Sequence, residues 1–227
     1  MGSPEGEVGR GSDEKQVDVR ITKGFWMAET ELTQGQWSAV MGTNPSKFKG
    51  ASLPVESVSY DEVIQYIAAL NAKHALPAGW EWILPTEAQW EYACRAGAKG
   101  PFNIGGKDVS SLSSKDANFN GNFPHGGAAK GTYLEKTTPV KSYAPNTWGL
   151  YDMHGNVWEW CYDGYGETLP GGPNPKVESG TFRVVRGGRW SSNAEHCRAA
   201  SRYGYSPGGR SGDLGFRPAV SISGTQE

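Results

Sequence analysis

The clearest pattern in the chain is an apolar stripe at helical spacing in residues 60–74. Val63, Tyr66, Ile67 and Leu70 recur three or four positions apart, as on the buried face of an amphipathic helix. Polar residues fill the positions between them. The pattern therefore predicts a helix that packs this stripe against a core.

Capping boxes mark the starts of three helices. In this motif a Ser or Thr precedes the helix and a Glu or Gln follows three residues later, so that each side chain binds a free backbone N–H of the first turn. The pairs are Thr33 with Gln36, Ser59 with Glu62, and Thr86 with Gln89. They predict helices over 33–41, 60–74 and 87–96, with Gly42 and Gly97 as stops.

The remaining apolar positions come in short runs typical of β-strands. Residues 17–33 alternate apolar and polar and predict a strand or hairpin, whereas residues 98–139 are rich in Gly, Ser, Asn and Lys and predict a long loop. Short β-like runs follow at 138–143, 148–153, 157–163, 182–190 and 215–220. This order predicts an α+β fold with a small, twisted, mostly antiparallel sheet, helices and much irregular loop.

The pattern also divides the chain. Residues 1–16 are polar without periodicity and predict a disordered lead or an expression remnant. Residues 17–222 are long enough to bury one core and predict a single domain. Residues 223–227 remain as a tail.

Composition narrows the function classes. The 22 basic and 24 acidic residues leave a net charge of -2, so we expect no nucleic-acid partner. No apolar run approaches the roughly 18 residues of a membrane span, and we expect none. Glycine, at 32 residues, is about twice as frequent as usual, which indicates a loop-rich chain. The compartment stays open: export or a cell-surface location requires that an export signal was removed.

Six motifs in order carry a family resemblance: WMAETELTQGQWSAVMG, LPVESVSYDEVIQYIAALN, WILPTEAQWEYACRAG, NTWGLYDMHGNVWEWCYD, RVVRGGRW and LGFRPA. Together they resemble the formylglycine-generating enzyme (sulfatase-modifying factor) superfamily, a variant of the C-type lectin fold. The resemblance covers residues 20–220. It implies the fold, whereas function depends on the site that the fold holds.

The resemblance implies a copper site that this sequence does not complete. Enzymatic members bind copper through two cysteines five residues apart, and here Ser192 precedes Cys197 at that spacing. A hydroxyl does not replace a soft thiolate for Cu(I). We therefore expect a non-enzymatic protein that requires no cofactor, with Cys94, Cys161 and Cys197 as small buried or loosely exposed thiols. The alternatives are a catalytic, sulfatase-modifying-factor-like oxidase and an unassigned regulatory module of the same fold.

Residues 189–213 have the composition of a binding surface. Ser, Gly, Tyr, Asn, His and Asp dominate, as in antibody loops, where Tyr supplies contact area and small polar residues supply adaptable hydrogen bonds. An ordinary turn-rich surface loop is the alternative. The segment also resembles the variable region of proteins diversified by diversity-generating retroelements, in which Asn codons are randomised. Pro207 and Arg210 would be fixed positions between the varied ones.

This second resemblance implies a surface that recognises a protein or cell-surface ligand. Most of its positions are within one or two base changes of an Asn codon, whereas Glu195 and Arg189 are not single-step products of such a codon. The predicted ligand-binding residues are Trp190, Ser191, Ser192, Asn193, Glu195, His196, Tyr203, Gly204, Tyr205, Ser206, Gly208, Gly209, Ser211, Gly212 and Asp213.

The family resemblance also implies a structural calcium site in the motif YDMHGNVWEW. The ligands would be the Asp152 and Glu159 side chains and the Gly155 and Val157 carbonyls, all hard oxygen donors. An Asp-capped turn with Glu159 hydrogen-bonded in the core is an equal alternative. A second family site would use Asn118 and Phe119, but Thr132 stands where an acidic ligand is required.

Overall fold

Three helices form the first half of the chain, as the capping boxes predict. The computed structural model describes residues 1–222, so the predicted tail at 223–227 lies outside the described residues. The helices are α1 (Gln34–Met41), α2 (Tyr60–Lys73) and α3 (Glu87–Arg95), and both halves of the capping box are formed in each. Gly42 caps the end of α1, as predicted, whereas α3 is capped by Ala96, one residue before the predicted stop.

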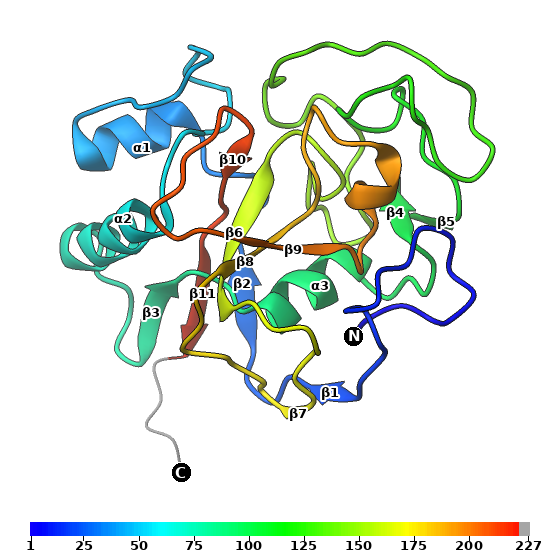
Figure 1. The fold of residues 1–227 in the computed structure, drawn as a ribbon. Coiled ribbons are helices and arrows are strands. Elements are labelled where there is room, and N and C mark those ends of the chain that lie inside the picture. The colour runs from blue at the N-terminus through cyan, green and yellow to red at the C-terminus, as the bar shows by residue number, and fades with distance from the viewer. Residues whose placement is uncertain (223–227) are drawn as a thin grey trace.

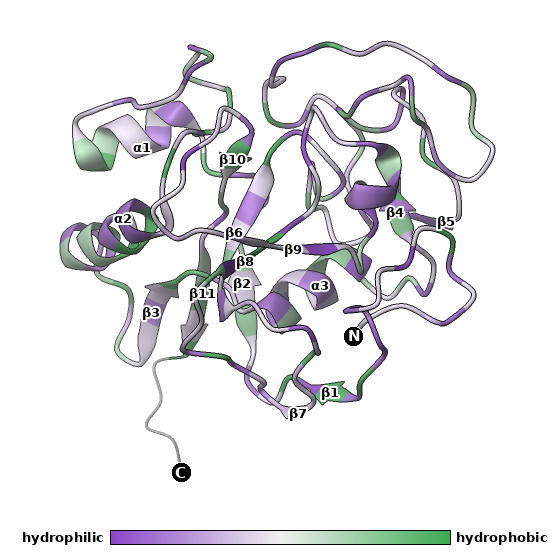
Figure 2. Ribbon diagram, viewed as in Figure 1, coloured by the Kyte–Doolittle hydropathy of each residue, from purple (hydrophilic) through white to green (hydrophobic). Residues whose placement is uncertain are grey.

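A four-stranded sheet lies at the centre of the molecule (Figure 1). Its order is β10 (Leu214–Gly215), β6 (Trp158–Gly164), β8 (Arg183–Arg186) and β9 (Arg202–Tyr205). β8 pairs antiparallel with β6 and β9, while β10 pairs parallel with β6. The strand β9 is short and hydrophilic (Figure 2), and it forms one edge of the sheet.

A second sheet brings the two ends of the domain together. β11 (Ala219–Ile222) lies between β2 (Phe25–Met27) and β3 (Trp80–Ile83), and both pairings are antiparallel. Two small pairs complete the structure: β1 (Val19–Arg20) runs parallel to β7 (Gly172–Pro173), and β4 (Phe102–Ile104) forms a hairpin with β5 (Lys107–Val109). A 3-10 turn, η1 (Ala194–Cys197), precedes β9.

The strand predictions are right in class and wrong in pairing. The α+β class and the mostly antiparallel pairing are confirmed, but the strands form separate sheets rather than one. Residues 17–33 contain two strands that pair with distant partners and not with each other, so the predicted hairpin is wrong. The long loop contains the β4–β5 hairpin, and no strand forms at 138–143 or 148–153.

The predicted disordered lead is also wrong, because residues 1–16 pack against the domain. Ser3 and Glu14 are buried. Glu14 forms an ion pair with Arg198 at 2.7 Å, and the Gly2 N–H donates to Glu91 on α3. Tertiary partners far along the chain order a segment whose local sequence is polar and irregular. No helix of the described residues is long and apolar enough to cross a membrane.

The main core lies between the central sheet and α1 and α2. The predicted stripe of α2 contributes to it, with Trp160, Val185 and Phe216 fully buried beside it. Phe216 contacts the rings of Trp37 and Tyr66 at centroid distances of 6.2 and 5.5 Å. The segment between β8 and β10 contacts this core through Tyr205.

Candidate functional site

The candidate ligand surface, residues 189–213, leaves the core through a glycine pair. Gly187 and Gly188 follow β8 with φ of 94° and 77°, which favours glycine. A Cβ on Gly188 would lie 2.5 Å from the Sγ of Cys197, so the chain can pass there only without a side chain. The segment then runs through η1 and β9 and returns to the core at β10.

Asp213 ties the two ends of this surface together. Its carboxylate pairs with Arg189 at 3.1 Å and accepts hydrogen bonds from Ser191, at 2.9 Å, and Ser211. Trp190 donates its indole N–H to the Gly212 carbonyl at 3.0 Å. Asp213 is buried, so this closure is part of the framework rather than of the exposed surface.

Aromatic side chains from two other loops flank Trp190. Tyr133 stacks on it at a centroid distance of 6.2 Å, and Phe48 meets it edge-on at 5.9 Å. Neither residue is in the predicted segment. Their positions relative to Trp190 depend on long-range packing, for which the sequence gives no local signal.

The residues of β9 differ in exposure: Arg202 is buried, Tyr203 is exposed, and Gly204 and Tyr205 are half-buried. Tyr203 is 56% exposed, and Tyr205 packs edge-on against the core residue Trp160 at 5.8 Å. On the other face, Arg202 makes two hydrogen bonds to Glu87, at 2.7 and 2.8 Å. Gly204 lies against a tyrosine ring, where a Cβ would come within 2.7 Å of ring carbons of Tyr165.

The predicted ligand-binding residues therefore divide into three groups. Those that are exposed are His196, Tyr203, Ser206 and Gly208. Those that are half-buried are Trp190, Ser191, Asn193, Glu195, Gly204, Tyr205, Gly209, Ser211 and Gly212. Ser192 and Asp213 are buried, and with the sterically confined Gly204 they belong to the framework.

The N-terminal segment packs against the candidate ligand surface through Arg198, a contact that the sequence did not predict. Arg198, directly after η1, is buried and donates to both oxygens of Glu14, to Glu7 at 2.6 Å and to the Gly9 carbonyl. In Figure 1 the first residues lie beside the end of β9. The acidic residues before position 16 are the one sequence feature that could have indicated an ion pair here, but their partner lies far away in the sequence.

The donor set for copper does not fit. Ser192 offers a hydroxyl, and the Cys197 thiol is fully buried. Burial raises the pKa of this thiol to about 12, so it stays protonated at neutral pH. Cys94 and Cys161 are buried as well, and burial also raises the pKa of both thiols.

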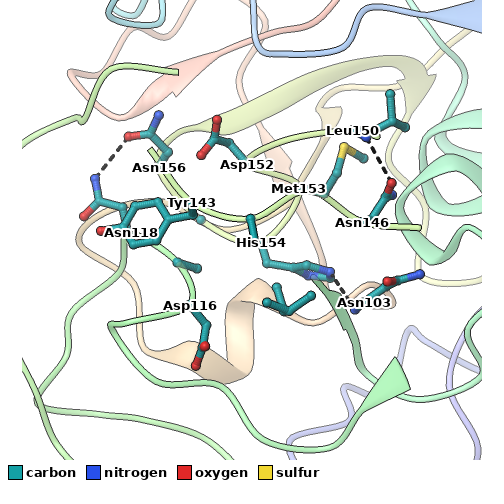
Figure 3. A pocket seen from close by; sticks show the side chains of 14 residues that line it. Asn103, Asp116, Asn118, Tyr143, Asn146, Leu150, Asp152, Met153, His154 and Asn156 are labelled. Carbon is teal, nitrogen blue, oxygen red and sulfur yellow. Dashed lines mark hydrogen bonds between the residues drawn. The ribbon is translucent and has the colours of Figure 1, made fainter. Parts of the chain in front are cut away.

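The turn predicted to bind calcium encloses a cavity of about 10 Å³, close to the smallest volume that holds one water (Figure 3). Asp152, Gly155, Asn118 and Asn156 line it. Asp152 and Asn156 have positive φ, of 59° and 65°. The Asp152 carboxylate accepts from the Lys141 backbone N–H at 2.9 Å, and burial raises its pKa to about 6.

Glu159 does not face this cavity as a free ligand. Its carboxylate accepts from Arg217 at 2.7 and 2.8 Å and from the indole of Trp90 at 2.6 Å. The buried guanidinium occupies the place beside Glu159 that a cation would need. The predicted calcium ligand set, which also included Gly155 and Val157, therefore does not fit, and the arrangement matches the alternative of a core hydrogen bond.

A third carboxylate that the sequence did not single out, Glu31, completes this network. Glu31 accepts from the backbone N–H of Val157 and from the Asn156 side chain, at 3.1 and 2.8 Å. Burial and the nearby Asp152 and Glu159 carboxylates raise its pKa well above the usual range. At the predicted second site the Asn118 side-chain oxygen is buried without a partner among the described residues, Phe119 is buried, and Thr132 is exposed.

Comparison with known proteins agrees with this architecture. The model of the sulfatase-modifying factor enzyme 1-like domain matches residues 3–222. The formylglycine-generating enzyme of Streptomyces coelicolor is 40% identical over 178 residues, 73% of this chain and 52% of that enzyme. The structure of Treponema denticola variable protein 1 has a TM-score of 0.78 at 29% identity, covering 96% of this chain and 92% of that chain. PvdO from Pseudomonas aeruginosa has a TM-score of 0.81 at 30% identity, covering 98% and 90%.

Fold and framework thus define an α+β domain of the formylglycine-generating-enzyme type, with the C-type lectin fold. The chain belongs to the family of sulfatase-modifying factor enzyme 1-like domains. It spans about half the length of the Streptomyces enzyme that it matches. The chain is similar both to a protein named as an enzyme and to a structure named as a variable protein, so the fold does not determine the function, which depends on this chain's own residues.

Proposed function

We propose that this chain is a non-enzymatic ligand-binding protein whose surface at residues 189–213 recognises a protein or cell-surface ligand. Recognition outside the cell would require export, so the proposal includes a location at the cell surface or beyond it. The observation that carries the proposal is the division of this surface into a fixed frame and freely exposed side chains. The similarity to a variable protein supports it further.

The frame and the exposed positions have separate physical roles. Asp213, Arg198 and Arg202 are buried and tied by ion pairs, so they fix the backbone path. His196 and Tyr203 are exposed to solvent. Changes at exposed positions of this kind usually alter stability by less than about 0.5 kcal/mol, so binding specificity can change without loss of the fold.

Sequencing the gene in closely related isolates tests this proposal. We expect substitutions to concentrate at codons 196, 203, 206 and 208, and to be absent at the framework residues Ser192, Gly204 and Asp213. The diversified codons should fall at template adenines beside a reverse transcriptase gene and a near-copy repeat. An invariant window with no such neighbour would overturn the proposal and leave the fold assignment intact.

The catalytic alternative rests on the identity with the Streptomyces enzyme. It would need Cu(I) bound by Cys197 without a second thiolate. Purified protein should be loaded with Cu(I), and oxygen consumption should be measured with a cysteine-containing peptide. We expect no turnover above free copper. Stoichiometric copper together with oxygen consumption that Cys197→Ser abolishes would establish the enzyme and reject our proposal.

A further inference from the structure

A groove lined by two tryptophans lies away from the surface at residues 189–213. Its volume is about 730 Å³, within the range of ligand sites, and its floor is the three-stranded sheet beside α1 and α2. Val220 of the central strand pairs with Trp26 on one side and with Trp82 on the other. Directly paired residues share one face of a sheet, so both indoles stand on the same face with Val220 between them.

The two indoles differ in hydrogen bonding and in exposure. Trp82 is fixed, because Asn71 forms two hydrogen bonds with its backbone at 2.8 Å and its indole N–H donates to the His74 carbonyl at 3.1 Å. Trp26 is 73% exposed, the highest exposure among the large aromatic side chains of the described residues. The neighbouring residues Phe25 and Met27 point to the opposite face and pack against a second core cluster, which anchors the strand that carries Trp26.

The rim of the groove is polar, and among the described residues that line it the acidic and basic side chains are paired. Its carboxylate, Glu29, and its ammonium group, Lys141, pair with each other at 2.5 Å. Gln36 uses its side-chain oxygen in the capping box of α1, which leaves its amide N–H groups for a ligand. Apart from the His74 ring, the described lining offers a charged ligand no free partner, whereas a neutral ligand with many hydroxyl groups would find both apolar ring faces and hydrogen bonds.

We propose that this groove binds a neutral oligosaccharide. The C–H face of a pyranose ring stacks on an indole face, while its hydroxyl groups remain at the polar rim. The two indoles are separated by two strand spacings, about 10 Å, so a ligand that contacts both must contain several rings. This site does not depend on the proposed function of residues 189–213.

Titration with cellohexaose, xylohexaose and chitohexaose tests the inference, using calorimetry and tryptophan fluorescence on the full chain. We expect at least one to bind at millimolar concentration or below, with an affinity that a roughly tenfold change in salt leaves unchanged because the ligand is neutral. Trp26→Ala should weaken binding about tenfold or more. Because Trp26 is exposed, this variant should remain folded.

Two control variants show whether the sugar binds in this groove or elsewhere on the protein. Trp148→Ala removes another exposed indole, outside the groove, and should bind as the wild type does. Tyr203→Ala should bind the sugar normally, so failure of the other proposed surface would not imitate failure here. The inference is overturned if none of the three sugars binds, if Trp26→Ala binds equally well, or if sedimentation shows a dimer that Trp26→Ala dissociates, since a second copy would then cover the groove.

Discussion

At the scale of single residues, the space around a glycine separates framework positions from variable ones. Gly204 and Gly208 both lie in the predicted variable segment and both have negative or extended backbone conformations. A Cβ on Gly204 would meet the Tyr165 ring, whereas a Cβ on Gly208 would meet no atom within 4 Å. The two positions therefore differ in what the fold tolerates, although their residue type is the same.

The corresponding prediction is that Gly204→Ala lowers the free energy of unfolding by about 1–3 kcal/mol, because the ring and strand must move apart. Gly208→Ala, the matched control, should change it by less than about 0.5 kcal/mol. Denaturant unfolding measures both. Equally small effects of the two substitutions would show that the packing around Gly204 is as loose as that around Gly208.

A second residue-scale prediction concerns His154, which is buried. Its Nδ1–H donates to the Cys197 carbonyl at 2.8 Å, and its Nε2 accepts from the Asn103 backbone N–H at 3.1 Å. Burial lowers the pKa of His154 from its ordinary 6.5 to about 4. The unfolded chain thus binds a proton below pH 6.5 that the folded chain does not, so stability should fall as the pH drops from 6.5 towards 4.

Stability measured from pH 7 to pH 4 for wild type and His154→Gln tests this. The difference between the two profiles should amount to about 3 kcal/mol over this window, with the wild type losing more. His196→Gln removes an exposed histidine instead and should leave the wild-type profile unchanged. Parallel profiles for wild type and His154→Gln would assign the pH dependence to other groups.

At the scale of elements, the N-terminal segment and η1 form one unit. The buried Arg198 depends on Glu14 for two of its hydrogen bonds. Removing one partner of a buried ion pair leaves an uncompensated charge, so Glu14→Gln should lower the free energy of unfolding by about 3 kcal/mol. The neighbouring exposed Lys15 provides the control, Lys15→Gln, which should have little effect.

Hydrogen exchange would show where the loss of Glu14 acts. We expect faster exchange in the Glu14→Gln variant at η1 and β9, and unchanged exchange in α2, which packs on the other side of the central sheet. Uniform acceleration throughout the chain would indicate only global destabilisation. Unchanged stability would mean that Glu7 alone compensates Arg198.

At the scale of the whole molecule, a buried ion pair links the C-terminal part of the chain to the central sheet. Arg217, near the C-terminal strand, pairs with Glu159 on β6 and donates to the Tyr151 carbonyl at 2.9 Å. We therefore expect millimolar Ca²⁺ to leave the melting temperature unchanged. A saturable rise that Asp152→Asn abolishes would contradict this expectation and restore calcium as a structural ligand.

The sequence by itself determined the local features of this protein. The three helix starts were predictable because a capping box acts within four residues, and the α2 stripe because its period reflects one buried face. That position 192 holds a serine and not the second thiolate of a copper site also follows from the sequence alone, since it depends only on residue identity. The family motifs carried the fold class for the same reason: they are contiguous in sequence.

Only the tertiary structure decided the pairings between distant residues. Strand alternation predicts a strand but not its partner, so the joining of β2 to β11, almost two hundred residues later, could not be derived. Residues 1–16 have the polar, irregular sequence of a disordered lead. The partner that neutralises Glu14 is Arg198, 184 residues away, so the sequence gives no sign that the segment packs against the domain. In the sequence Glu159 could be either a metal ligand or a core hydrogen-bonding residue, and only the structure shows that Arg217 pairs with it. Composition reports how many charges a chain has, whereas burial and distance determine which of them are paired.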